Sequence, residues 1–263
     1  MANNCMNRKI IMIKSISFLL ALLASQWAFS YGDTGHKTVA AMAWQHLTPF
    51  AKQNVERILG SGKDKFINAS VWADHIKSDE RFNYLKPMHY VNLPKAASQY
   101  NRARDCKKDK CIVEAIKTFS RVAKTGSRKE QRLALRMIIH LIGDIHQPLH
   151  AGLKEDRGGN WYEVKYEDST VSLHKLWDHQ LVERIGEDWQ SITETLLQNS
   201  IEVPVYNPKT WAEESHQIAV GVVYQAKENR KVTAEYLEKA EAISKQQLGR
   251  AAWRLAWWLN KLW

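Results

Sequence analysis

The sequence predicts an all-α, single-domain protein with one small β-hairpin, and three observations lead to this fold class. Helix-start signals, apolar residues at helical spacing and helix-stop signals recur along most of the chain. One pair of segments, Trp161–Tyr166 and Val171–Leu173, has the residue pattern of a hairpin, joined by a Glu-Asp-Ser turn. No low-complexity linker divides residues 31–263, a length that suits one large domain.

The N-terminal segment has the organisation of a secretory signal peptide. Basic residues precede a short apolar segment, Phe18–Ala24, and small residues suited to cleavage follow at Ala28–Ser30. The apolar segment is too short to cross a bilayer. We therefore expect residues 1–30 to be a signal peptide and residues 31–263 to form the mature domain. The protein should be secreted or periplasmic, without stable membrane association.

The main helices can be placed from their capping signals. Thr48–Pro49 is typical of a helix start, and Gly60 of a helix end. A capping box at Ser127–Glu130 precedes a long apolar helix, and Asn207–Pro208 begins another. The apolar residues that recur at helical spacing, and should therefore be buried, are Leu133, Met137, Ile138, Leu141 and Ile145 in one segment and Leu248, Ala252, Leu255 and Leu259 in the last.

Charge and cysteine content restrict the ligand class and the redox compartment. The chain has a formal net charge of +10 and stays basic without the signal peptide, which favours polyanions such as nucleic acid, anionic lipid or cell-wall polymers. Cys5 leaves with the signal peptide. In an oxidising compartment we expect Cys106 and Cys111 to form a disulfide, with two free thiols as the alternative.

Two histidine–aspartate pairs have the spacing of metal ligands on a helix. His140 and Asp144 are four residues apart in a predicted helix, so their side chains project from one face. The same spacing recurs at His174 and Asp178. A single pair of this kind is more often a surface hydrogen bond, but the repetition favours metal binding. Imidazole and carboxylate ligands without thiolate suit zinc in a hydrolytic site.

Further candidate ligands surround these pairs. Pro148 should end or kink the preceding helix and direct His150 toward the cluster. Upstream, Asp74 ends a Trp-Ala-Asp motif and His89 lies in Met88–Asn92. The sequence therefore predicts a zinc site of the hydrolytic rather than the structural kind.

The ordered set of motifs resembles the zinc-dependent single-strand nucleases and 3'-nucleotidases of the mung bean nuclease type, which are related to bacterial zinc phospholipases C. The resemblance extends over almost all of the mature chain. The matching segments are Tyr31–His36, Trp72–Asp74, His89, His140–Asp144, Gln147–His150, Gly158–Asn160, His174 with Asp178, and Gly249–Ala256. The resemblance implies a multi-helix phospholipase C/nuclease-like fold.

The resemblance also implies three zinc ions per chain. The implied ligand sets are Asp74, His89, His140 and Asp144 for the first ion; His150, His174 and Asp178 for the second; and the amine and carbonyl of Tyr31 with His36 and Asp144 for the third. Asp144 would bridge the first and third ions. Tyr31 replaces the tryptophan common at this place in the family, but backbone ligands should tolerate the change.

The residues expected to contact substrate depart from the family pattern at two positions. Asn92 stands where many members have an aspartate, and Lys77 where many have an arginine. We expect Lys77 and Asn160 to contact the phosphate, and Asn92 to orient the attacking water or the base by hydrogen bonding. All three should act with Asp144 in catalysis. Tyr90, next to His89, should stack on an unpaired base and so favour single strands, with a role in the core as the alternative.

Together, these features predict a zinc-dependent endonuclease. It should hydrolyse single-stranded DNA and RNA to products with 5'-phosphates, act also as a 3'-nucleotidase on nucleotides, and be a monomer. A zinc-dependent phospholipase C is the alternative, because it shares the metal scaffold, but it should have a choline-sized or lipid-facing apolar entrance. A second alternative is an exported zinc-binding protein without activity, which would need no bridging aspartate.

Overall fold

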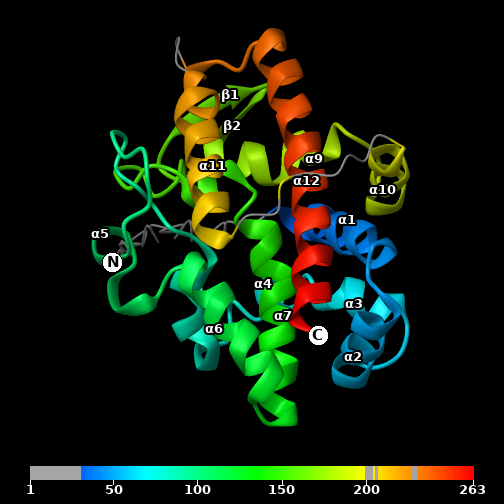
Figure 1. The fold of residues 1–263 in the computed structure, drawn as a ribbon. Helices are drawn as coiled ribbons and strands as arrows, with labels where there is room; N and C mark the ends of the chain where they lie inside the picture. The colour runs from blue at the N-terminus through cyan, green and yellow to red at the C-terminus, as the bar shows by residue number, and fades with distance from the viewer. Residues whose placement is uncertain (1–30, 199–203, 205–206, 227–229) are drawn as a thin grey trace, which may run out of the picture.

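The computed structural model describes residues 31–263 except 199–203, 205–206 and 227–229. The predicted signal peptide therefore lies outside the described residues. In the described part, helices dominate and the sheet has two antiparallel strands, which confirms an all-α fold with a small hairpin (Figure 1).

The elements follow one another with short connections. In chain order they are α1 (Gly32–Gln45), α2 (Pro49–Leu59), α3 (Lys63–Ala69), α4 (Trp72–His75), η1 (Glu80–His89), α5 (Arg102–Asp105), η2 (Lys107–Asp109), α6 (Ile112–Thr125), α7 (Arg128–Asp144), η3 (Pro148–Ala151), β1 (Glu163–Tyr166), β2 (Ser169–Ser172), α8 (Leu173–Lys175), η4 (Leu176–Gln180), α9 (Leu181–Glu183), α10 (Trp189–Leu197), α11 (Pro208–Gly221), η5 (Val223–Gln225) and α12 (Ala234–Leu262). Among the helices so described, none is both long and apolar enough to cross a membrane.

Helices α7 and α12 form the centre of the molecule (Figure 1). Helix α7 packs against α6, α12 and α2, and α12 packs along α1. The residues that sequence spacing predicted to be buried are buried in both helices, except Leu133, which is partly buried near the start of α7. The C-terminal end of α7 is buried on all sides, and this end carries His140 and Asp144.

The predicted caps are present and fix the helix boundaries. Thr48 Oγ1 accepts a hydrogen bond from the Ala51 amide at 3.1 Å, at the start of α2. The Ser127 amide donates to Glu130 Oε2 at 2.8 Å before α7, and Asn207 Oδ1 accepts from the Lys209 amide at 3.0 Å before α11. These side chains satisfy backbone amides that have no partner inside the helix.

The hairpin differs slightly from the sequence prediction. Tyr166 pairs directly with Ser169, so the turn contains Glu167 and Asp168, and Ser169 belongs to the strand. A two-residue turn with positive φ matches the twist of paired strands, and Glu167 has a φ of 51°. Strand β2 ends at Ser172, whose hydroxyl accepts from the Lys175 amide at 3.1 Å and caps α8. The hairpin therefore leads directly into the segment that carries His174.

The predicted disulfide is confirmed. Cys106 and Cys111 are bonded, and both are buried at the edge of the core. The bond closes a short surface loop that contains η2.

Candidate metal centre

Three groups of histidine and aspartate side chains are arranged so that each could hold a metal ion. Within each group the ligand atoms all lie within 4.8 Å of one another. The groups are His36, Asp74 and His140; His89, His140 and Asp144; and His150, His174 and Asp178. All of the side-chain ligands expected from the sequence are buried and belong to these groups.

Asp144, at the end of α7, lies between two sets of histidines. Its Oδ1 is 3.2 Å from His36 Nε2, whereas its Oδ2 is 3.0 Å from His89 Nδ1 and 3.1 Å from His140 Nε2. Burial by itself raises the pKa of this carboxyl group, but the nearby imidazoles of His140 and His150 lower the pKa well below its usual value. The group is therefore an ionised carboxylate whose two oxygens face different partners.

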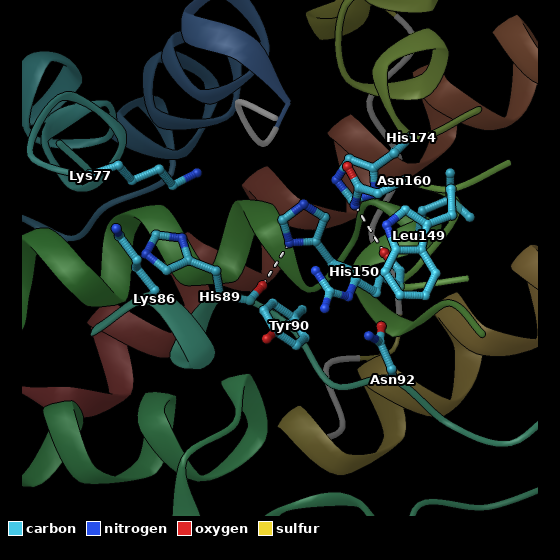
Figure 2. Close-up of a pocket in the computed structure, with 11 residues that line it drawn as sticks. Lys77, Lys86, His89, Tyr90, Asn92, Leu149, His150, Asn160 and His174 are labelled. Carbon is cyan, nitrogen blue, oxygen red and sulfur yellow. Dashed lines mark hydrogen bonds between the residues drawn. The ribbon is translucent and has the colours of Figure 1, made fainter. Parts of the chain in front are cut away.

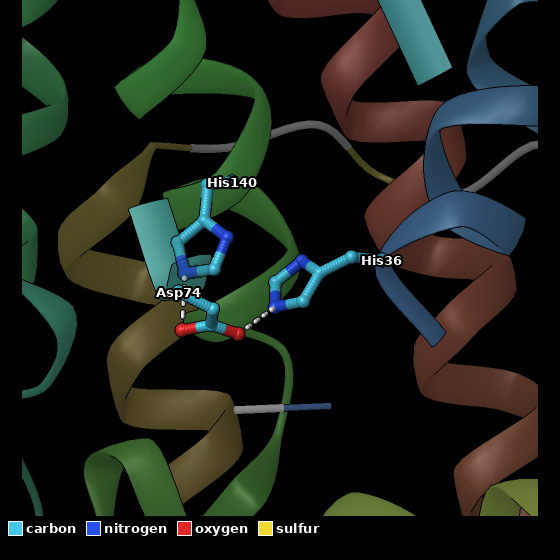
Figure 3. A group of neighbouring side chains, drawn as sticks. All are labelled: His36, Asp74 and His140. Atoms are coloured by element: carbon cyan, nitrogen blue, oxygen red, sulfur yellow. Dashed lines mark ion pairs between the residues drawn. The ribbon is translucent and has the colours of Figure 1, made fainter. Parts of the chain in front are cut away.

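Asp74, on α4, lies between the imidazoles of His36 and His140 (Figure 3). Its oxygens are 4.0 Å from His36 Nε2 and 3.6 Å from His140 Nε2. Lys77 forms an ion pair with the same carboxylate. His36, which the sequence grouped with Asp144, thus lies near both aspartates.

Backbone carbonyl groups set the orientation of three histidines. His140 Nδ1 is 2.6 Å from the Ser70 oxygen, His150 Nδ1 is 2.6 Å from the His89 oxygen, and His174 Nδ1 is 2.6 Å from the Gly158 oxygen. A carbonyl oxygen can only accept, so Nδ1 carries the hydrogen in each ring. In the neutral ring, Nε2 then has a lone pair available for a metal ion. His140 Nε2 lies 3.1 Å from Asp144 Oδ2, and His174 Nε2 lies 3.2 Å from Asp178 Oδ2.

The donor atoms fit divalent zinc. They are imidazole nitrogens and carboxylate oxygens in a buried site, and His150 Nε2 has no hydrogen-bond partner among the described residues. A buried polar atom without a partner is unfavourable unless a ligand completes its coordination. Three nearly fully buried aspartates, Asp74, Asp144 and Asp178, likewise require positive charge nearby.

The segment between the His140–Asp144 pair and the His174–Asp178 pair carries His150, a member of the second group. Helix α7 ends at Asp144, before Pro148, as predicted. Pro148 begins η3, a short helix that the sequence analysis did not predict and that carries His150. Gln147 makes a contact that the sequence did not reveal: its Nε2 donates to Asp178 Oδ1 at 2.5 Å. Gln147 belongs to the Gln-Pro-Leu-His motif, and this position was the sequence signal that could have indicated a role at the site.

His174 and Asp178 face each other as their spacing predicted. His174 Nε2 is 3.2 Å from Asp178 Oδ2. Asp178 lies in η4, which has π-helical hydrogen bonding, a feature frequent at functional sites.

The backbone of Tyr31 lies at the edge of this group. Its nitrogen donates to Asp178 Oδ1 at 3.3 Å, and its carbonyl oxygen accepts from the Gly35 amide at 3.1 Å. In the chain with residue 30 attached, the Tyr31 nitrogen is an amide and therefore donates to the nearest carboxylate. The structure thus places this nitrogen against Asp178, whereas the implied ligand set grouped it with Asp144.

A cavity of about 630 Å³ opens over the second group and His89 (Figure 2). All four residues expected to contact substrate line it: Lys77, Tyr90, Asn92 and Asn160. The sequence analysis missed other lining residues, namely Lys86, Leu149, Arg157 and Trp161.

Two aromatic side chains are exposed at this cavity. Tyr90 is 43% exposed and Trp161 is 63% exposed, so Tyr90 is not a core residue. Arg157 lies over the Trp161 ring at 4.3 Å, an arrangement that holds the ring by a cation–π interaction. Trp161 was assigned to a strand from its sequence pattern. Its position directly after Gly158–Asn160 was the signal that it belongs to the cavity.

The polar lining residues differ in how they are held. Asn92 Oδ1 is buried without a hydrogen-bond partner among the described residues, so it can accept from a bound molecule. Asn160 Nδ2 donates to the Arg157 carbonyl at 2.9 Å, which fixes the amide beside the cavity. Lys77 lines the cavity and also forms an ion pair with Asp74.

Comparison with known proteins places the chain among nucleases. The family model described as S1/P1 Nuclease matches residues 31–263. The chain is 27% identical to Nuclease S1 of Aspergillus oryzae, over 91% of this chain and 94% of that protein. It is 29% identical to Endonuclease 2 of Arabidopsis thaliana, over 92% and 93%, and 26% identical to Nuclease P1 of Penicillium citrinum, over 88% and 97%.

Proposed function

Because the chain belongs to the S1/P1 nuclease family, a family of phosphodiester hydrolases, we propose that it is a zinc-dependent endonuclease of single-stranded DNA and RNA. The products end in 5'-phosphate, and 3'-nucleotides are further substrates. The observation that carries the proposal is Asp144, whose two oxygens face different histidines beneath a cavity with a basic and aromatic rim.

Three zinc ions are proposed for the buried groups. Asp74, His89, His140 and Asp144 would hold the first, and His150, His174 and Asp178 the second. The third would take His36, the second oxygen of Asp144 and the backbone of Tyr31. The close approach of His36 to Asp144 supports this set.

Side chains of the protein are proposed to supply the functions that the metal ions do not. When bound, zinc ions supply a water nucleophile of lowered pKa and positive charge for the phosphate and the leaving oxygen. Asp144 would supply a carboxylate oxygen to each of two ions. Lys77 and the Asn160 amide would donate to the free phosphate oxygens, and Asn92 Oδ1 would orient a hydrogen-bond donor at the reacting group; their position in the lining of the cavity supports these roles.

Preference for single strands is proposed to come from the exposed rings at the cavity. Stacking on Tyr90 requires a base that has left its neighbours, which costs little in a single strand and much in a duplex. Trp161 offers a second ring at the same cavity.

The lining of the cavity favours nucleotides over phospholipids. Lys77, Lys86 and Arg157 are cationic, and among the described lining residues Leu149 is the one aliphatic side chain. A lipid-cleaving enzyme requires an apolar surface for acyl chains. The phospholipase alternative lacks support in this lining.

We also propose that the protein is secreted or periplasmic and acts as a monomer. The basic and apolar segments before residue 31 support export. The family match, which begins at residue 31, supports removal of residues 1–30 and a single mature domain.

A substrate panel tests the proposed function. The mature protein should cleave single-stranded DNA and RNA faster than duplex DNA, release phosphate from a 3'-nucleotide, and leave phosphatidylcholine intact. A chelator should abolish each activity, and added zinc should restore it. Cleavage of phosphatidylcholine without cleavage of nucleic acid would reverse the assignment.

A further inference from the structure

A second cavity adjoins the one above the metal ligands. It has a volume of about 410 Å³ and shares Tyr90 and Asn92 with the first. Its other lining residues are Pro87, Val91, Arg104, Asp105, Lys107, Lys110, Cys111 and Lys154. The segment around Tyr90 therefore separates two neighbouring cavities.

The second cavity has a strong excess of positive charge. Arg104 is neutralised by Asp105, with Nε 2.6 Å from Oδ1. Lys107, Lys110 and Lys154 form no ion pair with another residue in the described part of the chain. Three ammonium groups thus surround a concave surface without a counter-charge, which is an arrangement suited to an anion.

The backbones that carry these lysines are anchored on the segment shared by the two cavities. The disulfide between Cys106 and Cys111 closes the loop that carries Lys107 and Lys110, and the next amide, Ile112, donates to the Tyr90 carbonyl at 3.1 Å. On the other side, the Lys154 amide donates to the Leu93 carbonyl at 3.2 Å. The positive groups therefore have a fixed relation to the cavity above the metal ligands.

We propose that the second cavity binds a phosphate of the same nucleic acid strand whose cleavage site lies over the metal ligands. The inference rests on the proposed nuclease function and adds a subsite to it. A polymer has further phosphates beyond the one that reacts, and Lys107, Lys110 and Lys154 would bind one of them. A 3'-mononucleotide has none. The second cavity thus favours cleavage of polymers and has no effect on 3'-nucleotidase activity.

A second lysine-rich stretch provides a matched comparison. Lys124, Arg128 and Lys129 are exposed, but they line neither of these cavities. Lys129 precedes Asp144 by fifteen residues along α7, which corresponds to about 22 Å along the helix axis. Removal of these charges changes the net charge equally, at a distance from the cavity.

The test compares the triple variant Lys107→Gln/Lys110→Gln/Lys154→Gln with the control Lys124→Gln/Arg128→Gln/Lys129→Gln. For a single-stranded 20-nucleotide DNA, kcat/KM of the cavity variant should fall about tenfold at moderate salt. The slope of log kcat/KM against log salt should become shallower by about 0.7 for each phosphate that the variant no longer binds. Hydrolysis of a 3'-mononucleotide should stay within about twofold of wild type, which also shows that the variant is folded. The control should behave as wild type with both substrates.

Three results would overturn the subsite. They are unchanged oligonucleotide cleavage, an equal loss on both substrates, and an equal loss in the control variant. If the wild-type protein cleaves neither substrate, the proposed function fails instead. The Kd for a cleavage-resistant phosphorothioate 20-mer then tests the cavity directly, since only the cavity variant should bind it more weakly.

Discussion

The candidate metal ligands are buried and fixed by their neighbours, whereas the rim of the cavity above them, formed by Tyr90 and Trp161, is exposed. The ligands are buried, and each of His140, His150 and His174 is fixed by a backbone carbonyl on its far side. Tyr90 and Trp161 at the rim are exposed. A change in the buried groups disturbs several partners at once, whereas a change in the exposed rings leaves the contacts among the buried groups in place. We therefore expect the buried groups to determine the type of reaction, and the exposed side chains to determine the choice of substrate.

Loss of Asp144 should have the largest effect, because it faces both sets of histidines. Asp144→Asn should abolish cleavage and lower bound zinc by more than one equivalent per chain, measured by elemental analysis. Asp64→Asn, at an exposed position in α3, should have neither effect. If Asp144→Asn binds as much zinc as the wild-type protein, Asp144 does not bridge two ions.

Extension of the N-terminus should have the next largest effect, because a free amine at Tyr31 is part of the proposed third site. One extra residue before Tyr31 should remove most activity, while Tyr31→Trp, which keeps the backbone ligands, should act normally. N-terminal sequencing of the exported protein shows whether the signal peptide is cleaved directly before Tyr31. Full activity of the extended chain, or a mature start elsewhere, would disprove the third site and leave the other two standing.

Substitution of Gln147 should have an intermediate effect, because it orients Asp178 without binding an ion itself. Gln147→Ala should weaken zinc binding at the second site by about 10–100-fold, measured by competition with a chelator. Gln190→Ala, an exposed glutamine on α10, is the control. Unchanged zinc affinity in Gln147→Ala would show that Asp178 is held without it.

The rim substitutions should have the smallest effects and leave the metals in place. Tyr90→Ala and Trp161→Ala should each raise KM for single strands by an amount equivalent to about 1–3 kcal/mol, with normal zinc content. Tyr84→Ala removes a similarly exposed ring outside both cavities and should change nothing. A loss of zinc in Tyr90→Ala would contradict the separation of interior and rim.

The parts of the structure that the sequence predicted are those encoded by local spacing. Helix caps, the buried faces of α7 and α12, and the pairs at His140 and His174 all depend on residues a few positions apart. The contact of Gln147 with Asp178 joins residues from separate segments, and no periodicity reveals it. Trp161 was misplaced for a related reason, since an aromatic residue before a strand resembles part of that strand. The hairpin turn was one residue too long because serine is common in turns, whereas strand twist decides the register.

The candidate ligands come from α1, α4, η1, α7, η3 and the α8–η4 segment, so no single stretch of the chain can assemble the site. Contacts between distant segments form late in folding, because the chain loses entropy before it gains their energy. We therefore expect zinc to be acquired at the end of folding and to stabilise the finished arrangement strongly. A chain that crosses a membrane unfolded would then take its metal on the far side, and the supply of zinc there would limit how much active enzyme accumulates.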